Sequence, residues 1–184
     1  MRVITGSARG RRLITLEGED VRPTTDKVKE ALFSIIQFEI EGRRVLDLFA
    51  GSGQLGIEAL SRGADRAVFV DKSKKSIEVI KENLENTGFT KSAAVLCTDS
   101  LSFVNTRAEN YDIAFLDPPY RTGLLQQALL GVSRIMNDGG VIICEAPFDE
   151  ELPEKAGDFT ADRVYKYGKI KLVTYRKKTG DDNE

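Results

Sequence analysis

The sequence predicts an α/β protein whose mostly parallel, doubly wound sheet carries helices on both faces and ends in an antiparallel hairpin. From residue 43 onward, short apolar runs such as RVLDLF and RAVFVD alternate with segments of helical periodicity. This alternation is typical of parallel strands joined by helices. The last segment, FTADRVYKYGKIKLVTYRK, breaks the rhythm because it reads as two strands that meet at Gly168.

Two further elements are expected before this core. The runs RVITGS and GRRLITL are short and alternating, and the link ARG between them predicts a β-hairpin. Apolar residues in VRPTTDKVKEALFSIIQFEI then follow helical spacing, which predicts a helix over residues 24–41 that ends at Gly42. Thr24, Thr25 and Asp26 supply the polar side chains that favour a first helical turn.

The length of 184 residues fits one domain. We expect a single domain over residues 1–178, made of a basic hairpin extension (1–22), the leading helix (24–41) and the sheet core (43–178), followed by an acidic tail (179–184). Cys97 and Cys144 each end an apolar run, so both are expected to be buried thiols without a disulfide. No long apolar stripe demands a partner, which favours a monomer.

Composition limits the chemistry that is open to the chain. It contains 0 histidines, which excludes Ser-His-Asp triads and histidine-containing metal sites, and we expect no metal. No stretch approaches the roughly 20 apolar residues of a membrane span. The basic start MRVITGSARGRRL lacks the apolar segment of a secretory signal. These features favour a cytoplasmic protein with no membrane partner.

Positive charge gathers at the two ends of the chain. Residues 1–16 carry four arginines and no acid, and residues 163–178 carry seven Lys or Arg and no acid, although the net charge is −2. Such an asymmetry on a nearly neutral chain favours a local anionic partner. The alternative is that both ends are edge strands whose charges prevent unwanted pairing.

A glycine-rich loop, GSGQLG, lies between a predicted strand and a predicted helix. Gly51 and Gly53 would let the backbone approach a ligand, and the helix N-terminus offers free N–H groups. Asp71 ends the next strand, where a carboxylate can accept both hydroxyls of a ribose. The loop by itself fits either a dinucleotide or S-adenosylmethionine.

Asp47 favours S-adenosylmethionine of these two ligands. A carboxylate inside the first strand would repel a pyrophosphate, whereas it suits a ligand with a free amino group. After the third strand, Asp99 and Ser100 could hold an adenine amino group, and Asp99 could equally cap the next helix. The expected cofactor-binding residues are Asp47, Phe49, Gly51, Ser52, Gly53, Asp71, Lys72, Asp99 and Ser100.

The fourth strand runs directly into the residues DPPY. Two prolines present carbonyl groups without competing N–H donors. The Asp117 carboxylate and the Pro118 carbonyl could grip the hydrogens of an exocyclic amino group and turn its lone pair toward a methyl donor. Tyr120 could stack on the base. We therefore expect Asp117, Pro118, Pro119 and Tyr120 to form the catalytic loop, with Asp117 acting as an acceptor or as a base.

These motifs resemble those of a known family. DLFAGSGQLGIEAL, FVD, TDSLSF and DPPY look like the ordered motifs of class I S-adenosylmethionine-dependent amino methyltransferases. RVITGSARGRRL and RPTTDKVKEALFSII are similar to the bacterial RsmD family, the 16S ribosomal RNA guanine-N2 methyltransferases. The resemblance runs from about residue 2 to residue 177. It implies a Rossmann-like fold with a seven-stranded sheet and S-adenosyl-L-methionine as cofactor.

The resemblance also gives the basic N-terminus an expected role. It implies 16S ribosomal RNA as partner, within a 30S subunit or an assembly intermediate, and a target guanine that is unstacked or flipped. The expected RNA-binding residues are Arg2, Arg9, Arg11, Arg12, Arg22, Thr24 and Thr25. Three rival readings remain: an amino methyltransferase acting on other RNA or on DNA adenine, an NAD-dependent oxidoreductase, and a non-catalytic RNA-binding factor.

Overall fold

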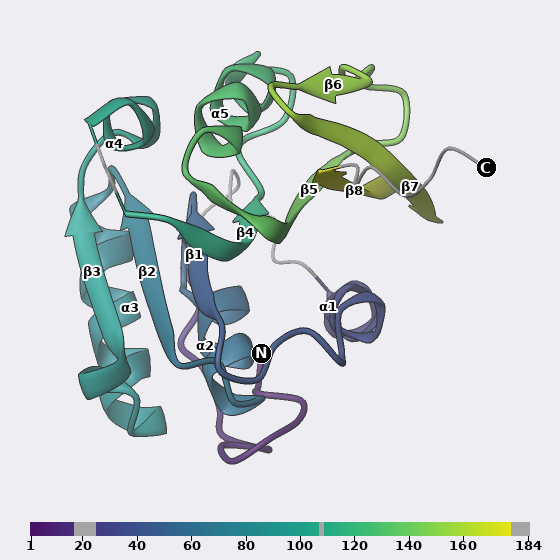
Figure 1. Ribbon diagram of the computed structural model, residues 1–184. Coiled ribbons are helices and arrows are strands. Elements are labelled where there is room, and N and C mark those ends of the chain that lie inside the picture. Colours follow the sequence, from purple (N-terminus) through teal and green to yellow (C-terminus); the bar gives the residue numbers. More distant parts are fainter. Residues whose placement is uncertain (17–24, 107–108, 178–184) are drawn as a thin grey trace.

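The chain forms one eight-stranded sheet with helices on both faces (Figure 1). The computed structural model describes residues 1–16, 25–106 and 109–177. The strand order is β3-β2-β1-β4-β5-β8-β7-β6. The strands are β1 (Arg44–Leu48), β2 (Arg66–Asp71), β3 (Ala93–Cys97), β4 (Tyr111–Leu116), β5 (Met136–Pro147), β6 (Lys155–Ala156), β7 (Phe159–Tyr167) and β8 (Ile170–Lys177).

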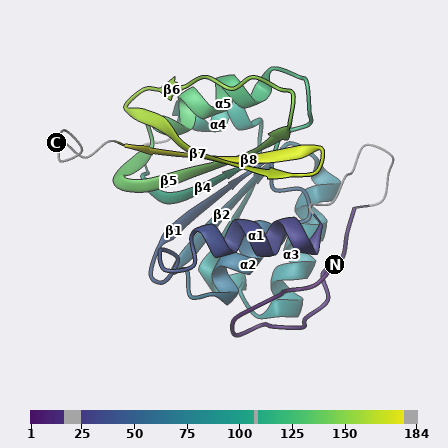
Figure 2. The same cartoon turned by 90° about the vertical axis from the view of Figure 1, so that its right-hand side faces the viewer.

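Helices cover the sheet in two layers. With the sheet seen nearly edge-on, α1, α2 and α3 lie on one side and α4 and α5 on the other (Figure 2). The helices are α1 (Asp26–Ile35), α2 (Gln54–Ser61), α3 (Lys74–Thr87), α4 (Ser100–Thr106) and α5 (Leu124–Ser133), with a short 3-10 helix, η1 (Thr90–Ser92), before β3. Among the described helices, none combines the length and the apolar character that a membrane span requires.

The sheet confirms the predicted class, with one more strand than the seven expected. β1 to β5 are parallel, and β8 and β7 are antiparallel. Gly168 adopts a φ of 63° at the hairpin turn between β7 and β8. The eighth strand is β6, whose two residues pair with the start of β7. A strand this short has too few residues to show alternation in the sequence.

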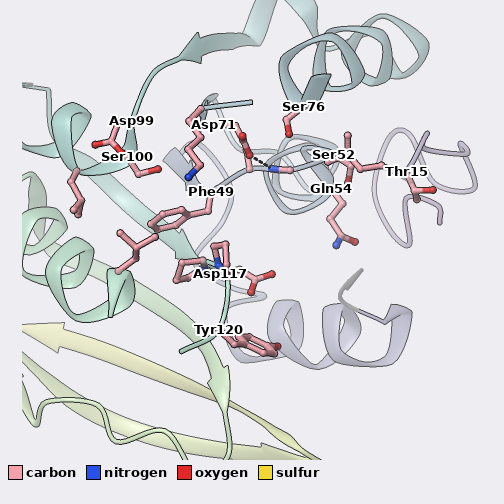
Figure 3. A pocket seen from close by; sticks show the side chains of 18 of the residues that line it. Thr15, Phe49, Ser52, Gln54, Asp71, Ser76, Asp99, Ser100, Asp117 and Tyr120 are labelled. Atoms are coloured by element: carbon pink, nitrogen blue, oxygen red, sulfur yellow. Dashed lines mark hydrogen bonds between the residues drawn. The ribbon is translucent and has the colours of Figure 1, made fainter. Parts of the chain in front are cut away.

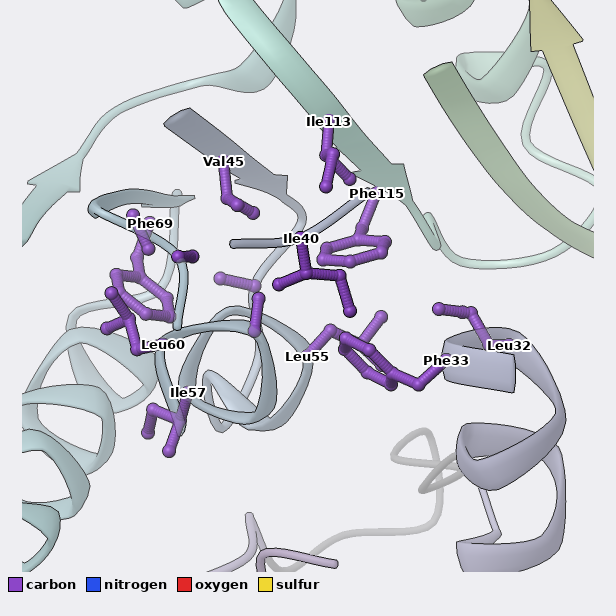
Figure 4. Packing of buried hydrophobic residues seen from close by; sticks show 14 of the residues in the cluster. Leu32, Phe33, Ile40, Val45, Leu55, Ile57, Leu60, Phe69, Ile113 and Phe115 are labelled. Carbon is purple, nitrogen blue, oxygen red and sulfur yellow. The ribbon is translucent and has the colours of Figure 1, made fainter. Parts of the chain in front are cut away.

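The apolar residues of the core form one cluster under each helical layer. In the cluster beneath α1 and α2, Phe33 and Phe115 meet with ring centroids 5.6 Å apart (Figure 4). Gly56 in α2 lies so close to β2 that an added Cβ would be 2.3 Å from the Phe69 ring. The last glycine of GSGQLG therefore brings the helix against the sheet.

The leading helix is shorter than predicted. α1 starts at Asp26, after its cap Thr25, and ends at Ile35 rather than at residue 41. The chain then turns, with the Glu39 N–H donating to the Ile36 carbonyl at 2.9 Å. This turn buries Ile40 beside Phe115 and leaves Phe38 94% exposed (Figure 4). Helical spacing alone could not show that Ile40 packs after a turn.

Two smaller expectations also change. The predicted N-terminal hairpin is present but short, with one antiparallel bridge between Arg2 and Arg12. Backbone hydrogen bonds from Val3 to Arg11 and from Leu13 to Met1 join its two sides. Further hydrogen bonds attach it to α2 and α3, as described below. Cys144 is buried as predicted, but Cys97 is exposed. Cys97 ends β3, which lies at the edge of the sheet, so an apolar run there does not imply full burial. The predicted acidic tail, residues 179–184, lies outside the described residues.

Candidate active site

A cavity of about 330 Å³ opens at the carboxyl ends of the parallel strands (Figure 3). The chain runs outward from β1 to β2 and β3 on one side and from β4 to β5 on the other, so β1 and β4 form the topological switch point, where ligands bind in sheets of this class. The cavity is lined by Met1, Thr15, Leu16, Phe49, Ala50, Gly51, Ser52, Gln54, Asp71, Lys72, Ser76, Asp99, Ser100, Leu101, Asp117, Pro118, Pro119, Tyr120 and Leu124.

The glycine loop forms one wall of the cavity, but its two glycines have different roles. Gly51 has a φ of 54°, and an added Cβ there would meet nothing nearer than the Leu16 side chain at 4.0 Å. Gly53 has a φ of 77°, and its added Cβ would approach the buried Ile80 and Phe69 side chains within 3.2–3.3 Å. Gly51 therefore leaves room for a ligand, while Gly53 allows close packing and does not line the cavity.

Phe49 lies in a backbone conformation that is rare for a residue with a side chain. Its φ is 84°, and a non-glycine residue in this region costs about 1–3 kcal/mol. The N–H groups of Phe49 and Ala50 both donate to the Val70 carbonyl, which holds the turn. The half-buried ring lines the cavity, between Ser100 and Asp117 in Figure 3.

Asp71 joins the end of β2 to the glycine loop. Its Oδ2 accepts a hydrogen bond from the Gly51 N–H at 2.9 Å, and its Oδ1 accepts one from the Ser73 N–H at 2.8 Å. Each carboxylate oxygen keeps a second lone pair, and the side chain lines the cavity. The predicted ribose-binding position is therefore compatible with the structure.

Asp47 lies beneath the loop rather than in the cavity. It is 4% exposed, its Oδ2 accepts a hydrogen bond from the Gly56 N–H at 2.9 Å, and it is not among the lining residues. Burial raises the pKa of this carboxyl to about 7, and the Gly56 hydrogen bond opposes the rise. In this structure Asp47 holds the start of α2.

The remaining residues predicted around the cofactor do line the cavity. Lys72, Asp99 and Ser100 lie at the ends of β2 and β3, and Ser52 lies in the glycine loop. Asp99 also caps α4, because its Oδ1 accepts a hydrogen bond from the Ser102 N–H at 2.9 Å. Its capping role and its place at the cavity thus coexist.

All four residues of the DPPY loop line the same cavity. The Tyr120 hydroxyl donates to Glu145 Oε1 at 2.7 Å, which fixes the ring to the end of β5. The Pro119 carbonyl accepts a hydrogen bond from the Thr122 hydroxyl at 2.8 Å. Asp117 is half-buried and Pro118 is buried. The structure therefore brings the loop and the predicted cofactor residues to one site.

The N-terminal arm, residues 1–16, completes the wall. Asn83 in α3 is fully buried: its Oδ1 accepts from the Ile14 N–H at 2.7 Å, and its Nδ2 donates to the carbonyls of Ile14 and Ser52. One side chain thus links the arm to the glycine loop. This places Thr15 and Leu16 beside the cavity.

A buried charge cluster holds the other end of the arm. Glu58 in α2 accepts hydrogen bonds from the N–H groups of Ile4 and Thr5 and lies 3.7 Å from the Lys29 Nζ. Lys29 also donates to the Arg2 carbonyl at 2.6 Å. Burial lowers the pKa of Lys29, and the Glu58 carboxylate opposes this shift. The arm is therefore fixed to both α1 and α2.

The predicted RNA-binding residues that the structure describes are not among those lining the cavity. Arg2, Arg9, Arg11 and Arg12 are exposed on the arm, and Arg2 forms an ion pair with Asp26 at 3.7 Å. Thr25 caps α1, with its Oγ1 accepting from the Val28 N–H. Arg22 and Thr24 fall outside the described residues.

Sequence reasoning missed several residues of the site. Glu145 could have been found as an acid inside the apolar run VIICEAP. Asn83 gave no such signal, because polar residues are ordinary in a helix such as KKSIEVIKENLENT. Gln54 lines the cavity, and its buried Oε1 has no hydrogen-bond partner within the described part of the chain.

Comparison with known proteins relates nearly the whole chain to one family. The family model described as "Conserved hypothetical protein 95" matches residues 1–176. "Putative rRNA methyltransferase YlbH" of Bacillus subtilis is 42% identical over 97% of this chain and 100% of its own length. "Ribosomal RNA small subunit methyltransferase D" of Escherichia coli is 32% identical over 100% of this chain and 93% of its own length.

A solved structure shows the same fold. It is named "Putative methyltransferase yhhF from Escherichia coli", is 32% identical, covers 97% of this chain and 98% of its own, and has a TM-score of 0.86. The sequence matches and the structural match therefore relate nearly the whole chain to the same group of methyltransferases. The glycine loop, the DPPY loop and the N-terminal arm all lie within the matched residues. This chain belongs to the RsmD family of methyltransferases.

Proposed function

We propose that this protein methylates the exocyclic N2 amino group of a guanine in 16S ribosomal RNA. The general activity of its family is S-adenosylmethionine-dependent methylation of small-subunit ribosomal RNA. The observation that carries the proposal is the single cavity shared by the glycine loop, Asp71 and the DPPY loop. Such a substrate puts the reaction in the bacterial cytoplasm.

The cavity residues fit S-adenosyl-L-methionine. A volume of about 330 Å³ falls within the usual range for small-ligand sites. Asp71 would hold the ribose hydroxyls, Phe49 and Ser100 would border the adenine, and Gly51 leaves open space beside the loop. When bound, the cofactor supplies an electrophilic methyl group on a sulfonium with a neutral leaving group.

The DPPY loop would prepare the attacking nitrogen. The lone pair of an exocyclic amino group is delocalised into the base, so the group is a weak nucleophile. The Asp117 carboxylate and the Pro118 carbonyl would accept its two hydrogens, and the Tyr120 ring would set the plane of the base. The Glu145 hydrogen bond holds that ring in place before the substrate arrives. This alignment is the main contribution of the protein to the rate.

The exposed arginines of the arm would bind the RNA backbone. Arg2, Arg9, Arg11 and Arg12 lie on the surface of a segment that also forms a wall of the cavity. Phosphate contacts of this kind make affinity fall steeply with salt. We therefore expect each arginine-to-glutamine substitution to reduce the slope of log affinity against log salt by about 1.

The proposal can be tested directly. The protein is incubated with labelled S-adenosylmethionine and with 30S particles or naked 16S RNA from a strain that lacks the enzyme, and the modified nucleoside is identified. We expect N2-methylguanosine at one position. Methylation of another base, or the absence of transfer, contradicts the proposal.

The role of Asp117 needs a separate experiment. We expect Asp117→Ala to retain cofactor affinity and to lower kcat by about 100-fold or more, because one of the two acceptors for the amino group is lost. Calorimetry with S-adenosylhomocysteine measures the affinity. A variant that binds the cofactor and methylates at the full rate would refute the proposed role.

A further inference from the structure

A second hollow of about 470 Å³ lies directly beside the DPPY loop. It shares Tyr120 with the first cavity, so the two are adjacent. Three segments form its walls: the residues after β4, those after β5, and the turn of the β7–β8 hairpin. It is lined by Tyr120, Arg121, Pro147, Phe148, Asp149, Gly168 and Lys169. None of the roles assigned above uses this hollow, which we call the hairpin groove.

An exposed aromatic ring borders the hairpin groove. Phe148 follows β5 and is 40% exposed. Its N–H donates to the Lys169 carbonyl at 2.9 Å, which fixes the backbone to the hairpin turn. The Lys166 Nζ lies 3.6 Å from the ring centroid, and the Lys171 Nζ lies 6.0 Å from it. The Lys166 ammonium covers one face of the partly exposed ring, and a base could stack on the ring once Lys166 turns toward a phosphate.

The charges around Phe148 favour an anionic ligand. Lys166 and Lys171 are direct partners in the β7–β8 register, and like charges at opposed positions destabilise a sheet. Lys171 is partly compensated because its Nζ donates to the Glu150 carbonyl. Lys166 and Lys169 are exposed. Binding of a negatively charged ligand at the hairpin would relieve this repulsion between the two lysines.

Three acids, Asp149, Glu150 and Glu151, follow Phe148 and reduce the positive charge around the groove, but only Asp149 is among the residues that line it. Arg121 forms an ion pair with Asp149 at 3.0 Å, and the two side chains are 72% and 70% exposed. Exposed pairs of this kind contribute little and exchange readily with other partners. Arg121 directly follows Tyr120 and has a φ of 59°, which is rare for a residue with a side chain. A phosphate could therefore replace Asp149 at the edge of the target-base site.

We propose that the hairpin groove binds the nucleotide next to the target guanosine. This inference rests on the proposed RNA substrate. The base of that nucleotide stacks on Phe148, and the adjoining phosphates contact Lys166, Lys169 and Arg121. An unstacked guanosine at Tyr120 brings its neighbour along the strand to the adjacent groove. Stacking on an aromatic ring beside cations is a common way to bind single-stranded nucleic acid.

The groove would then act together with the N-terminal arm. The arm forms one wall of the first cavity, and the hairpin groove adjoins that cavity at Tyr120. An RNA strand held by both would be fixed on either side of the flipped base. This arrangement gives Lys166 and Lys169 of the basic C-terminal run a role in binding RNA. Arg176 and Lys177 of the same run are instead held in ion pairs within the protein.

The first test is Phe148→Ala, assayed on 30S particles from a strain that lacks the enzyme. We expect kcat/KM for RNA to fall about 5- to 150-fold, with an unchanged KM for S-adenosylmethionine, because loss of base stacking costs that much. Phe148→Trp should restore most of the activity. Phe38→Ala removes another exposed aromatic residue, which is 94% exposed and belongs to neither lining set, and should have no effect.

The second test concerns the phosphate contacts. We expect the double substitution Lys166→Gln and Lys169→Gln to reduce the slope of log affinity for RNA against log salt by about 1 to 2. Lys91→Gln changes an exposed lysine in η1, outside both lining sets, and serves as the matched control. An unchanged slope in the double variant would overturn the role of the lysines.

Cross-linking can identify the nucleotide that contacts Phe148. A photoreactive phenylalanine analogue at position 148 should cross-link to the nucleotide adjacent to the methylated base. Cross-linking only to a ribosomal protein overturns the inference, as does a Phe148→Ala variant with full kcat/KM on RNA. If the unaltered protein transfers no methyl group to RNA, the proposed function itself fails, so the two failures are distinguishable.

Discussion

The buried carboxyl group of Asp47 should make the stability of this protein depend on pH. Its pKa rises from 3.8 to about 7 in the folded state, because burial disfavours the charged form. Between these values the folded state holds a proton that the unfolded state has lost. The free energy of unfolding therefore decreases as pH rises through this window. Each pKa unit corresponds to about 1.4 kcal/mol, so the full effect is about 4 kcal/mol.

Asp47→Asn should remove this dependence. An asparagine has nearly the same shape, and its Oδ1 can still accept the hydrogen bond from Gly56. Near pH 4 the two proteins should differ in stability by less than about 1 kcal/mol, because the folded carboxyl is protonated and the unfolded one is only partly ionised. Above pH 7 the variant should be more stable by up to about 4 kcal/mol. Urea unfolding of the cofactor-free protein between pH 4 and pH 8.5 measures the difference.

A matched control separates burial from the simple loss of a charge. Asp65 is exposed in the loop between α2 and β2, so Asp65→Asn should leave the difference in unfolding free energy flat across the same pH range. If the advantage of Asp47→Asn does not grow with pH, the carboxyl is ionised in the folded protein. The reasoning about its burial is then refuted.

Three further substitutions test the packing and the site. Gly56→Ala should lower the unfolding free energy by about 1–3 kcal/mol, since its Cβ would be 2.3 Å from the Phe69 ring; Gly139→Ala, which meets nothing within 4 Å, is the control in urea unfolding. Lys29→Met should cost about 1–3 kcal/mol in the same assay, because it removes one cation beside buried Glu58, which keeps Arg62 at 2.9 Å. Tyr120→Phe should lower kcat less than about 10-fold in the methyl-transfer assay, because the ring remains and only the Glu145 hydrogen bond is lost.

The sequence was sufficient to predict the sheet and the two loops of the site. Both loops follow buried strands, and the carboxyl ends of parallel strands lie at one edge of a sheet, so local patterns could place Gly51 and Asp117 together. The N-terminal arm could not be placed in this way. Its position depends on hydrogen bonds to Asn83 and Glu58, which lie more than 50 residues away along the chain. Only the folded chain shows such pairings.

The position of Asp47 shows why a motif residue need not contact a ligand. From the sequence, the Asp47 carboxylate is expected to contact the free amino group of the cofactor. In the structure it is buried and bonded to Gly56, while Gly51 and Asp71 border the open cavity. The glycine loop must leave room for a ligand, so it has few protein contacts on the side that faces the cavity. Its shape therefore depends on contacts on the opposite side, such as the hydrogen bond between Asp47 and Gly56. Substitutions at Asp47 or Gly56 should therefore alter stability first, and affinity only through the shape of the loop.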